Sequence, residues 1–388
     1  MTGTGELSVM SDRPFTLDEF RARVSRVQRL LVERGLDAGL VTRPQNVYYL
    51  TGFRSMGAGL AAGMGQVHAA LVPRSGDPVL FMRSLETKAA HKYAWTEIVP
   101  YRDFEDAYAA IAGRLPTGAA RVGVEYIDIT ALQLERFRRA CPTVDVEDVS
   151  MLVEGLRRVK SGQELACVRE AARLANLGLQ AAIDAVREGV RVSTVIAEAT
   201  RAMYDAGQDD ISWPPVLVWS GPDGGLMHDT SLDGVVERGD LVTIEITGDV
   251  QLYTADAMGT ICAGPSSKEV AQGYDVAVAL HNAAQATLRS GATGDDVHAA
   301  ADRVFRSGGH GPYTRRVGGT IGINAQPALF FEGLNLLKGE RGALERGMTV
   351  LVQPGVDTPG MIIVASTNVI TDGGYEELTR PLLELVCR

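Results

Sequence analysis

Apolar and polar positions follow two different periods along the chain. From Phe15 to about Asp148, short apolar runs alternate with segments whose apolar residues recur every three or four positions. The first pattern is typical of buried strands and the second of amphipathic helices. Their alternation predicts an α/β domain over residues 13–150, and we expect a second domain over residues 151–388.

The first helix carries its own start signal. Thr16 is a favourable N-cap residue, and Glu19 follows three positions later, as in a capping box. Phe15 and Phe20 flank this pair with the spacing of a hydrophobic staple. The helix is predicted to run from this signal to a stop at Gly35.

The second domain uses one pattern twice. A long amphipathic helix over 161–189 precedes a shorter one over 193–207, and the same succession returns at 268–291 and 295–308. A helix–helix–strand unit used twice predicts a pseudo-twofold domain with its site between the halves. Chance similarity between two amphipathic helix pairs is the alternative.

One stretch of the second domain combines strand periodicity with acidic residues. Gly239–Gly264 reads as two apolar strands joined by a turn at Gly248–Asp249. Glu245 lies on the first strand and Asp256 on the second, so a hairpin would bring both carboxylates to one cavity. Such a pair suggests a metal site or an acid/base pair. The alternative is that both side chains point to solvent.

Composition narrows the class of protein. An apolar fraction of 45% over 388 residues is that of a folded chain, and a net charge of -10 argues against nucleic acid as a partner. No apolar run approaches the roughly 20 residues of a membrane span, and no signal peptide is evident. We therefore expect a cytoplasmic protein. The cysteines, far apart in sequence, are expected to be buried thiols rather than disulfides or zinc ligands: Cys141, Cys167, Cys262 and Cys387.

Four motifs resemble the pita-bread superfamily, which includes methionine aminopeptidase, aminopeptidase P, prolidase and creatinase. They are VTRPQNVYYLTGF, LRRVKSGQELACVREAARLA, SGPDGGLMHDTSLDGVVERGDLV and VITDGGYEELT. The resemblance extends from about Phe15 to Thr379. It implies a ribonuclease-H-like N-terminal domain of the creatinase type and a C-terminal pita-bread catalytic domain. It also implies a homodimer in which the N-terminal domain contributes to the neighbouring site.

The metallopeptidases of this superfamily hold two metal ions with two Asp, one His and two Glu. Carried over one position at a time, these ligands fall on Glu245, Asp256, Gly319, Gln353 and Ala365. An imidazole and two carboxylates are thus replaced by a hydrogen atom, an amide and a methyl group. Because two metal ions need several anionic oxygens, we expect no metal and no cofactor. A single weakly bound Mg²⁺ or Ca²⁺ at Glu245 and Asp256 stays open.

The resemblance to creatinase suggests chemistry without metal. Creatinase uses a histidine as base, and that position falls on His228. We expect a metal-independent creatinase-like enzyme in which His228 is general base and then general acid, with Glu245 and Asp256 as its catalytic partners. The creatinase glutamate falls near Met258, so creatine itself does not carry over. The reaction on a small-molecule substrate is either C–N bond hydrolysis or an elimination or cyclisation in biosynthesis. Alternatively, His228 lies in a surface loop.

Five further side chains are predicted to contact the substrate: Tyr253, Gln353, Arg316, Arg54 and Trp219. Tyr253 would donate a hydrogen bond and Gln353 would orient the substrate through its amide. Arg316 would bind a carboxylate, although it and Arg315 cannot both do so from one strand. For Tyr253 and Trp219 the alternative is a place in the core, and for the arginines it is an exposed surface.

Two other functions remain open. The first alternative is that the chain is a catalytically inactive pita-bread binding protein, and the second is that it is a residual Xaa-Pro metallopeptidase. A compact two-domain chain without extra domains or charged tails favours an enzyme over a binding protein. A metal assay separates the residual peptidase from the metal-independent enzyme.

Overall fold

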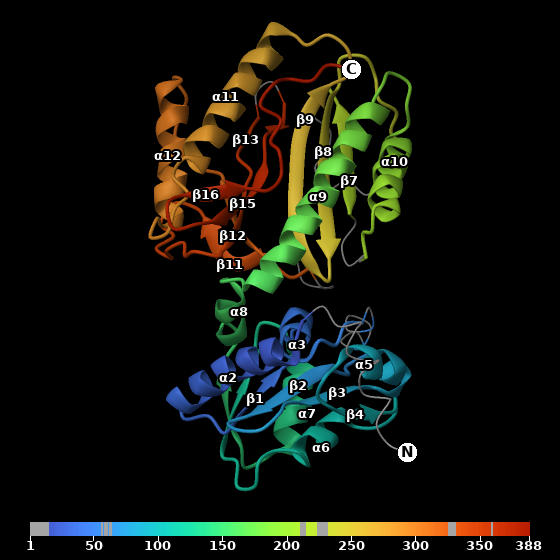
Figure 1. The fold of residues 1–388 in the computed structure, drawn as a ribbon, viewed down its shortest axis with the longest axis vertical. Helices are drawn as coiled ribbons and strands as arrows, with labels where there is room; N and C mark the ends of the chain where they lie inside the picture. The colour runs from blue at the N-terminus through green and yellow to red at the C-terminus, as the bar shows by residue number, and fades with distance from the viewer. Residues whose placement is uncertain are drawn as a thin grey trace. The chain divides into compact units, whose positions relative to one another are not determined.

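The computed structural model describes residues 15–55, 57, 61, 64–209, 215–222, 232–324, 331–357 and 360–388 (Figure 1). These residues form two compact units, one ending at Arg157 and the other beginning at Arg158. Each unit has its own hydrophobic core. Among the described residues, none of the helices has the length and apolar character needed to span a bilayer.

The N-terminal unit is a mixed sheet flanked by helices. Its six strands run in the order β4-β3-β2-β1-β5-β6. They are β1 (Ala38–Val41), β2 (Ala69–Pro73), β3 (Val79–Arg83), β4 (Glu97–Tyr101), β5 (Arg121–Val124) and β6 (Asp145–Asp148). The helices are α2 (Leu17–Glu33), α3 (Pro44–Thr51), α5 (Thr87–Tyr93), α6 (Ala107–Ala112), α7 (Ala131–Ala140) and α8 (Leu152–Arg157). The predicted α/β architecture is confirmed.

The predicted start of α2 is present with one difference. The Thr16 hydroxyl accepts a hydrogen bond from the Glu19 N–H at 3.3 Å, and the Phe15 and Phe20 rings meet edge to face at 5.9 Å. The Glu19 carboxylate turns instead to the Arg23 guanidinium, which donates to it at 3.3 Å. The cap therefore holds through the hydroxyl, while the acidic residue serves an ion pair one turn further on.

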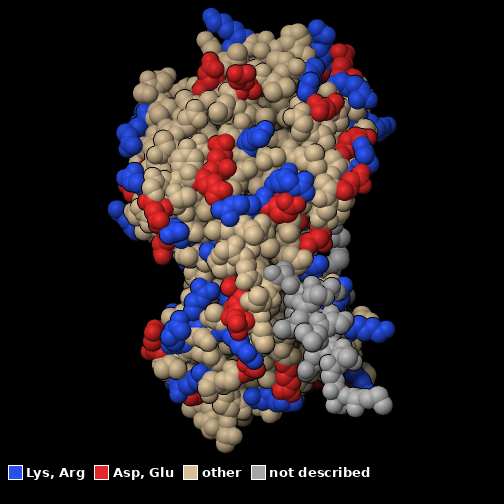
Figure 2. All heavy atoms as spheres, in the orientation of Figure 1, with Lys and Arg blue, Asp and Glu red and all other residues tan. Residues whose placement is uncertain are grey.

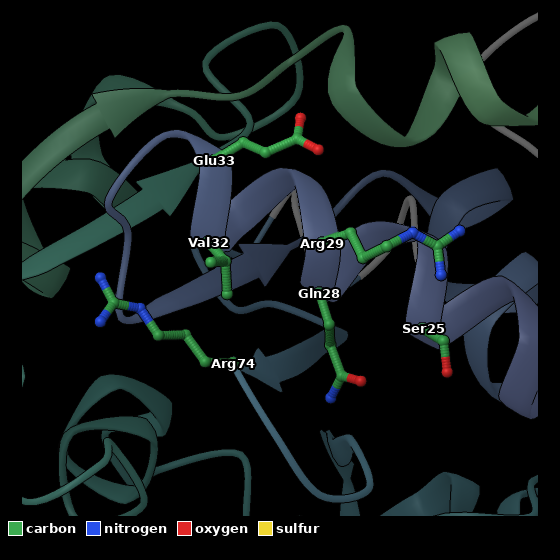
Figure 3. Close-up of a pocket in the computed structure, with 6 residues that line it drawn as sticks. All are labelled: Ser25, Gln28, Arg29, Val32, Glu33 and Arg74. Carbon is green, nitrogen blue, oxygen red and sulfur yellow. The ribbon is translucent and has the colours of Figure 1, made fainter.

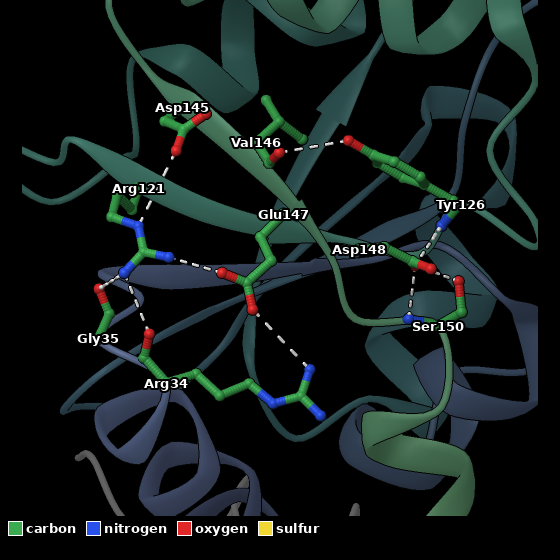
Figure 4. Close-up of polar contacts among 9 residues, drawn as sticks. All are labelled: Arg34, Gly35, Arg121, Tyr126, Asp145, Val146, Glu147, Asp148 and Ser150. Atoms are coloured by element: carbon green, nitrogen blue, oxygen red, sulfur yellow. Dashed lines mark hydrogen bonds and ion pairs between the residues drawn. The ribbon is translucent and has the colours of Figure 1, made fainter.

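Polar contacts also fix the edge of this sheet (Figure 4). The Arg121 guanidinium of β5 donates to the Glu147 carboxylate of β6 at 2.6 Å and to the Arg34 carbonyl at 3.1 Å. Asp148 accepts from the Ser150 N–H at 2.9 Å as β6 ends. These bonds join the end of α2 to the β5–β6 edge, so they serve the fold of this unit.

A carboxylate stands in the interior of the same unit. Glu125, 0% exposed at the end of β5, accepts hydrogen bonds from the N–H groups of Thr42 at 2.7 Å and Arg43 at 2.8 Å, and from the Asn46 amide. Arg43 is the N-cap of α3 and makes no side-chain cap bond of its own. The Glu125 carboxylate thus accepts hydrogen bonds from the N–H groups that lead into α3, on the segment that follows the neighbouring strand β1. Burial raises the pKa of Glu125 to about 7, against the lowering effect of these bonds.

The C-terminal unit contains two larger sheets. One has the order β7-β8-β9 and the other β11-β10-β12-β15-β16, with the pair β13-β14 beside them. The strands of the first are β7 (Val216–Gly221), β8 (Leu241–Val250) and β9 (Tyr253–Cys262). The others are β10 (Gly318–Ile321), β11 (Phe331–Leu336), β12 (Thr349–Val352), β13 (Gly355–Val356), β14 (Ile362–Ile363), β15 (Ser366–Ile370) and β16 (Tyr375–Glu377).

Each of the two larger sheets is covered by a pair of helices, as Figure 1 shows. α9 (Gly162–Ala185) and α10 (Val192–Asp205) share a core with β7–β9. α11 (Lys268–Gln285) and α12 (Gly294–Ser307) share another with β11 and β12. The predicted helix–helix–sheet plan therefore occurs twice. On the face seen in Figure 2, acidic and basic side chains are interspersed.

The hairpin turns at a different place from the predicted one. β8 and β9 are joined by Gln251 and Leu252, whose φ angles are 53° and 64°. Gly248 lies within β8, where an added Cβ would stand 2.1 Å from the Ala171 carbonyl oxygen of α9. The prediction of a turn at Gly248–Asp249 is wrong, because this glycine permits close approach of a helix.

We expect Glu125→Ala to lower the free energy of unfolding by about 3 kcal/mol, since several buried donors would lose their acceptor. Glu125→Gln should cost less, because its amide oxygen can keep part of the network. Urea denaturation measures both. Glu135→Ala, on the exposed face of α7, is the control and should stay within about 0.5 kcal/mol of the parent. A loss below about 1 kcal/mol for Glu125→Ala would mean that the network is dispensable.

Candidate functional site

The β8–β9 hairpin has one apolar and one polar face. Side chains alternate along a strand, and the face that carries Ile244 and Ile246 belongs to the core shared with α9. The opposite face carries Glu245, Thr247 and Asp256. In the register Thr247 stands opposite Asp256, and Glu245 opposite Met258. The hairpin therefore places both predicted acids on the same face, in neighbouring cross-strand pairs.

Asp256 is buried without a partner for its charge. It is 0% exposed, and in the described part of the chain neither carboxylate oxygen has a hydrogen-bond partner. Its backbone is held firmly, since its N–H donates to the Thr367 hydroxyl at 2.9 Å and its carbonyl accepts from the hydroxyls of Thr367 at 2.8 Å and Thr379 at 2.9 Å. The strand is thus fixed while the carboxylate stays available to a ligand.

The two acids act on one another. Burial raises the pKa of Asp256 well above its ordinary value, and the nearby charges of Glu245 and Asp249 raise it further. Burial also raises the pKa of Glu245 to about 7. Asp256 is buried and Glu245 is half-buried, and two neighbouring carboxylates with so little access to solvent favour a proton or a cation between them. The alternative of a solvent-facing pair is therefore excluded for Asp256.

Asp249 is a member of this group that the sequence did not reveal. It is 0% exposed on the same face of β8, and the Asn324 amide donates to its carboxylate at 3.2 Å. Its N–H donates to the Gln208 side chain at 2.9 Å. The predicted turn at Gly248–Asp249 took Asp249 off the polar face of the strand. Continuing the period of two from Glu245 through Thr247 would have identified it.

An apolar cluster lies beside Glu245. Its buried members are Trp219, Met258, Ile321, Leu351, Ile363 and Ala365. The Ala365 N–H donates to the Met258 carbonyl at 3.1 Å, so the two segments are adjacent. Resemblance gives the position of the superfamily's final acidic ligand to Ala365, which thus contributes a methyl group to this apolar cluster.

The position given by resemblance to the ligand histidine is closed. A Cβ added to Gly319 of β10 would stand 3.1 Å from the Leu334 carbonyl oxygen and 3.5 Å from the Phe331 ring. The Arg316 guanidinium lies 4.2 Å from the centroid of that ring. An added Cβ is thus tightly placed against the Leu334 carbonyl and in ordinary van der Waals contact with the Phe331 ring.

The donor set fits one divalent cation and does not fit two. In the described ranges no group of three or more His, Cys, Asp or Glu residues could hold a metal ion. Glu245 and Asp256 are the carboxylates placed for an ion, since Asp249 already accepts from the Asn324 amide, and within the described ranges the oxygens of Asp256 lack hydrogen-bond partners. One ion of the Mg²⁺ or Mn²⁺ kind can be held by one or two carboxylates together with water or substrate.

The structure gives the predicted substrate contacts different surroundings. The Tyr253 hydroxyl donates to the Glu164 carboxylate at 2.5 Å, which joins β9 to the start of α9. Trp219 is 4% exposed and belongs to the apolar cluster beside Glu245. Gln353 is half-buried directly after β12. His228 lies outside the described residues.

The two neighbouring arginines precede β10 and do not lie on a strand as predicted, and they take different partners. Arg315 pairs with the Asp357 carboxylate at 2.6 Å. Arg316 is half-buried over Phe331, and burial lowers the pKa of its guanidinium. Arg54 belongs to the N-terminal unit, where its guanidinium lies 5.1 Å from the Tyr93 ring centroid.

A surface hollow of the N-terminal unit carries none of this chemistry (Figure 3). It is lined by Ser25, Gln28, Arg29, Val32, Glu33 and Arg74. The Gln28 amide donates to the carbonyls of Pro73 at 3.0 Å and Gly76 at 2.8 Å. The Gln28 side chain in this hollow thus holds α2 to the β2–β3 turn.

Known proteins with the same architecture are peptidases by name. An Xaa-Pro dipeptidase of Pyrococcus furiosus is 22% identical over 369 residues, which cover 94% of this chain and 100% of the relative. The solved Xaa-Pro dipeptidase from Bacillus anthracis matches with a TM-score of 0.83 at 23% identity, covering 95% of this chain and 100% of that one. A dipeptidase from Mycobacterium ulcerans matches with a TM-score of 0.81 at 24% identity, covering 96% and 99%.

These relatives overturn the predicted function. The expectation of a metal-independent, creatinase-like enzyme with His228 at its centre is wrong, because the similar proteins are Xaa-Pro dipeptidases and prolidases. Their names support an enzyme of the hydrolase class. They give no support to a lyase or a cyclase.

The raised pKa values predict how stability depends on pH. In protein treated with a chelator, the folded state holds more protons than the unfolded state between about pH 4.5 and about pH 7. The free energy of unfolding therefore falls as the pH rises through this window. Asp256→Asn removes one charge, so its melting temperature should fall less than that of the parent.

Thermal unfolding across that window measures the difference. Asp275→Asn, on the exposed face of α11, is the control and should follow the parent. Parallel curves for the parent and Asp256→Asn would contradict the repulsion between the two acids.

Family models cover both units of the chain. The creatinase/prolidase N-terminal domain matches residues 23–159. The model of metallopeptidase family M24 matches residues 166–372, more than half of the chain. The predicted resemblance to the pita-bread superfamily and the predicted two-domain fold are thereby confirmed. The chain belongs to metallopeptidase family M24.

Proposed function

We propose that the chain is a residual peptidase of family M24 that hydrolyses the peptide bond of short Xaa-Pro substrates. The observation that carries the proposal is that the buried Asp256 carboxylate, beside Glu245, has no hydrogen-bond partner among the described residues. By resemblance, these are two of the five positions at which metallopeptidases of the superfamily hold metal. The names of the relatives support the same substrate class.

Glu245 and Asp256 would hold one divalent cation through their carboxylate oxygens. Such an ion lowers the pKa of a bound water and so supplies the nucleophile of hydrolysis. The desolvation that raises the pKa of both acids also strengthens their attraction for a cation. With Gly319, Gln353 and Ala365 at the remaining positions, binding and turnover should be weaker than with a complete ligand set.

The apolar cluster beside Glu245 suits a substrate that contains proline. Trp219 and Met258 belong to the buried cluster beside Glu245. Apolar and aromatic side chains around a few polar groups are typical of small-molecule sites and favour a rigid apolar ring such as that of proline. Gln353 and Arg316 stay predicted contacts for the polar ends of the substrate.

Three earlier expectations carry over as proposals. His228 is kept as a site residue, and Arg54 as a contribution of the N-terminal domain to a neighbouring site. We propose a homodimer, whose mass light scattering after gel filtration measures. A mass of one chain at micromolar concentration would remove the role proposed for Arg54.

A panel of Xaa-Pro dipeptides tests the function. We expect hydrolysis in the presence of Mn²⁺, its loss on chelation and its return when Mn²⁺ is restored. Glu245→Gln and Asp256→Asn should each lower kcat/KM by about 100-fold or more, since each removes charge that stabilises the transition state.

The exposed variant Asp275→Asn is the control for this assay and should retain full activity. The proposal fails if no Xaa-Pro dipeptide is cleaved with any divalent metal. It also fails if Asp256→Asn is as active as the parent.

A further inference from the structure

Two cysteines that are 125 positions apart in sequence lie side by side in the fold. Cys262 ends β9, and a parallel bridge pairs it with Cys387. The Cys262 N–H donates to the Val386 carbonyl at 2.9 Å, and the Arg388 N–H donates to the Cys262 carbonyl at 2.9 Å. The expectation of a buried thiol is wrong for Cys387, which is exposed, and the separation of the two cysteines in sequence gives no sign of their contact.

The spacing of such a bridge suits a covalent bond. Neighbouring strands lie about 4.7–4.9 Å apart, within the range of Cα separations that a disulfide spans. Paired residues of a parallel bridge also direct their side chains to the same side of the sheet. The Cys387 thiol lies close enough to Cys262 to add to the effect of burial, which raises the pKa of Cys262.

The two thiols differ in their access to solvent. Cys387 is exposed, whereas Cys262 is buried at 1% exposure. An oxidant from solution therefore meets Cys387 first, and Cys262 is placed to react with the product. This division into an attacking and a resolving thiol is typical of cysteine pairs that oxidise reversibly.

The segment that Cys387 would anchor supports the site strand. The Thr379 hydroxyl donates to the Asp256 carbonyl at 2.9 Å, and the Tyr274 hydroxyl donates to the Leu382 carbonyl at 2.8 Å. An added Cβ at Gly259 of β9 would stand 2.5 Å from the Leu382 side chain. Residues 379–388 thus lie against β9 from Asp256 to the end of the strand.

We propose that Cys262 and Cys387 form a reversible disulfide that fastens residues 379–388 to β9 when a peroxide is present. The Cys387 thiolate attacks one peroxide oxygen, which leaves a sulfenic acid on Cys387, and the displaced hydroxide takes up the proton that the thiol had lost and leaves as water. The Cys262 sulfur then attacks the sulfenic sulfur, and the displaced hydroxide takes the Cys262 proton and leaves as a second water. The peroxide is reduced, and the two thiols lose two electrons in all.

Peptide mapping of the full chain under non-reducing conditions tests the pair. After hydrogen peroxide treatment we expect one cross-linked peptide that joins Cys262 to Cys387, a mass loss of two hydrogen atoms, and reversal by a thiol reductant. The melting temperature of the oxidised chain should rise by about 3 °C or more, because the bond closes a long loop of the unfolded chain.

Cys387→Ser is the informative variant, since its exposed side chain can change without disturbing the core. It should abolish both the cross-link and the rise in melting temperature. Cys167→Ser, half-buried on α9, is the matched control and should keep both. Cys387 oxidised only to sulfinic acid, or a bond between Cys387 residues of two chains, would overturn the proposal.

Discussion

The structure of the site follows from one electrostatic constraint, which is that the half-buried Glu245 and the buried Asp256 share one face of a hairpin. Asp256 has no hydrogen-bond partner for its side chain in the described part of the chain, and Glu245 raises its pKa further. An isolated charge in such a place is costly, so the pair favours a proton or a cation.

Several ordinary features of the fold preserve this costly arrangement. The backbone of α9 approaches β8 closely at Gly248, where a side chain would not fit. Thr367 and Thr379 bond the backbone of Asp256, and its carboxylate has no hydrogen-bond partner among the residues that the structure describes. The Tyr253 hydroxyl bonds Glu164 and secures the other end of β9. The site is thus positioned by groups that do not neutralise it.

Local signals in the sequence predicted most of the fold. The hydroxyl cap of α2 and the repeated helix pairs needed only neighbouring residues, and both are present. The hairpin turn was misplaced because Gly–Asp is a common turn signal, whereas Gln251 and Leu252 reach positive φ without glycine. Asp249 was missed as a consequence. The contact of Gly248 with α9 is a tertiary fact that no local pattern contains.

The function was harder to predict than the fold. Counting lost ligands at Gly319, Gln353 and Ala365 led to an enzyme without metal, while the relatives of the whole chain are peptidases. The retained pair at Glu245 and Asp256 carries more information than the three losses, because its burial keeps a strong demand for positive charge. The adjacency of Cys262 and Cys387 was likewise beyond the sequence, since only the folded chain brings them together.

Calorimetric titration with Mn²⁺ tests the demand for positive charge most directly. The account predicts that one ion binds per chain and that protons are released on binding, because the pKa of Glu245 is raised to about 7. Asp256→Asn should abolish both. Binding of two ions with high affinity, or no difference between the parent and Asp256→Asn, would contradict it.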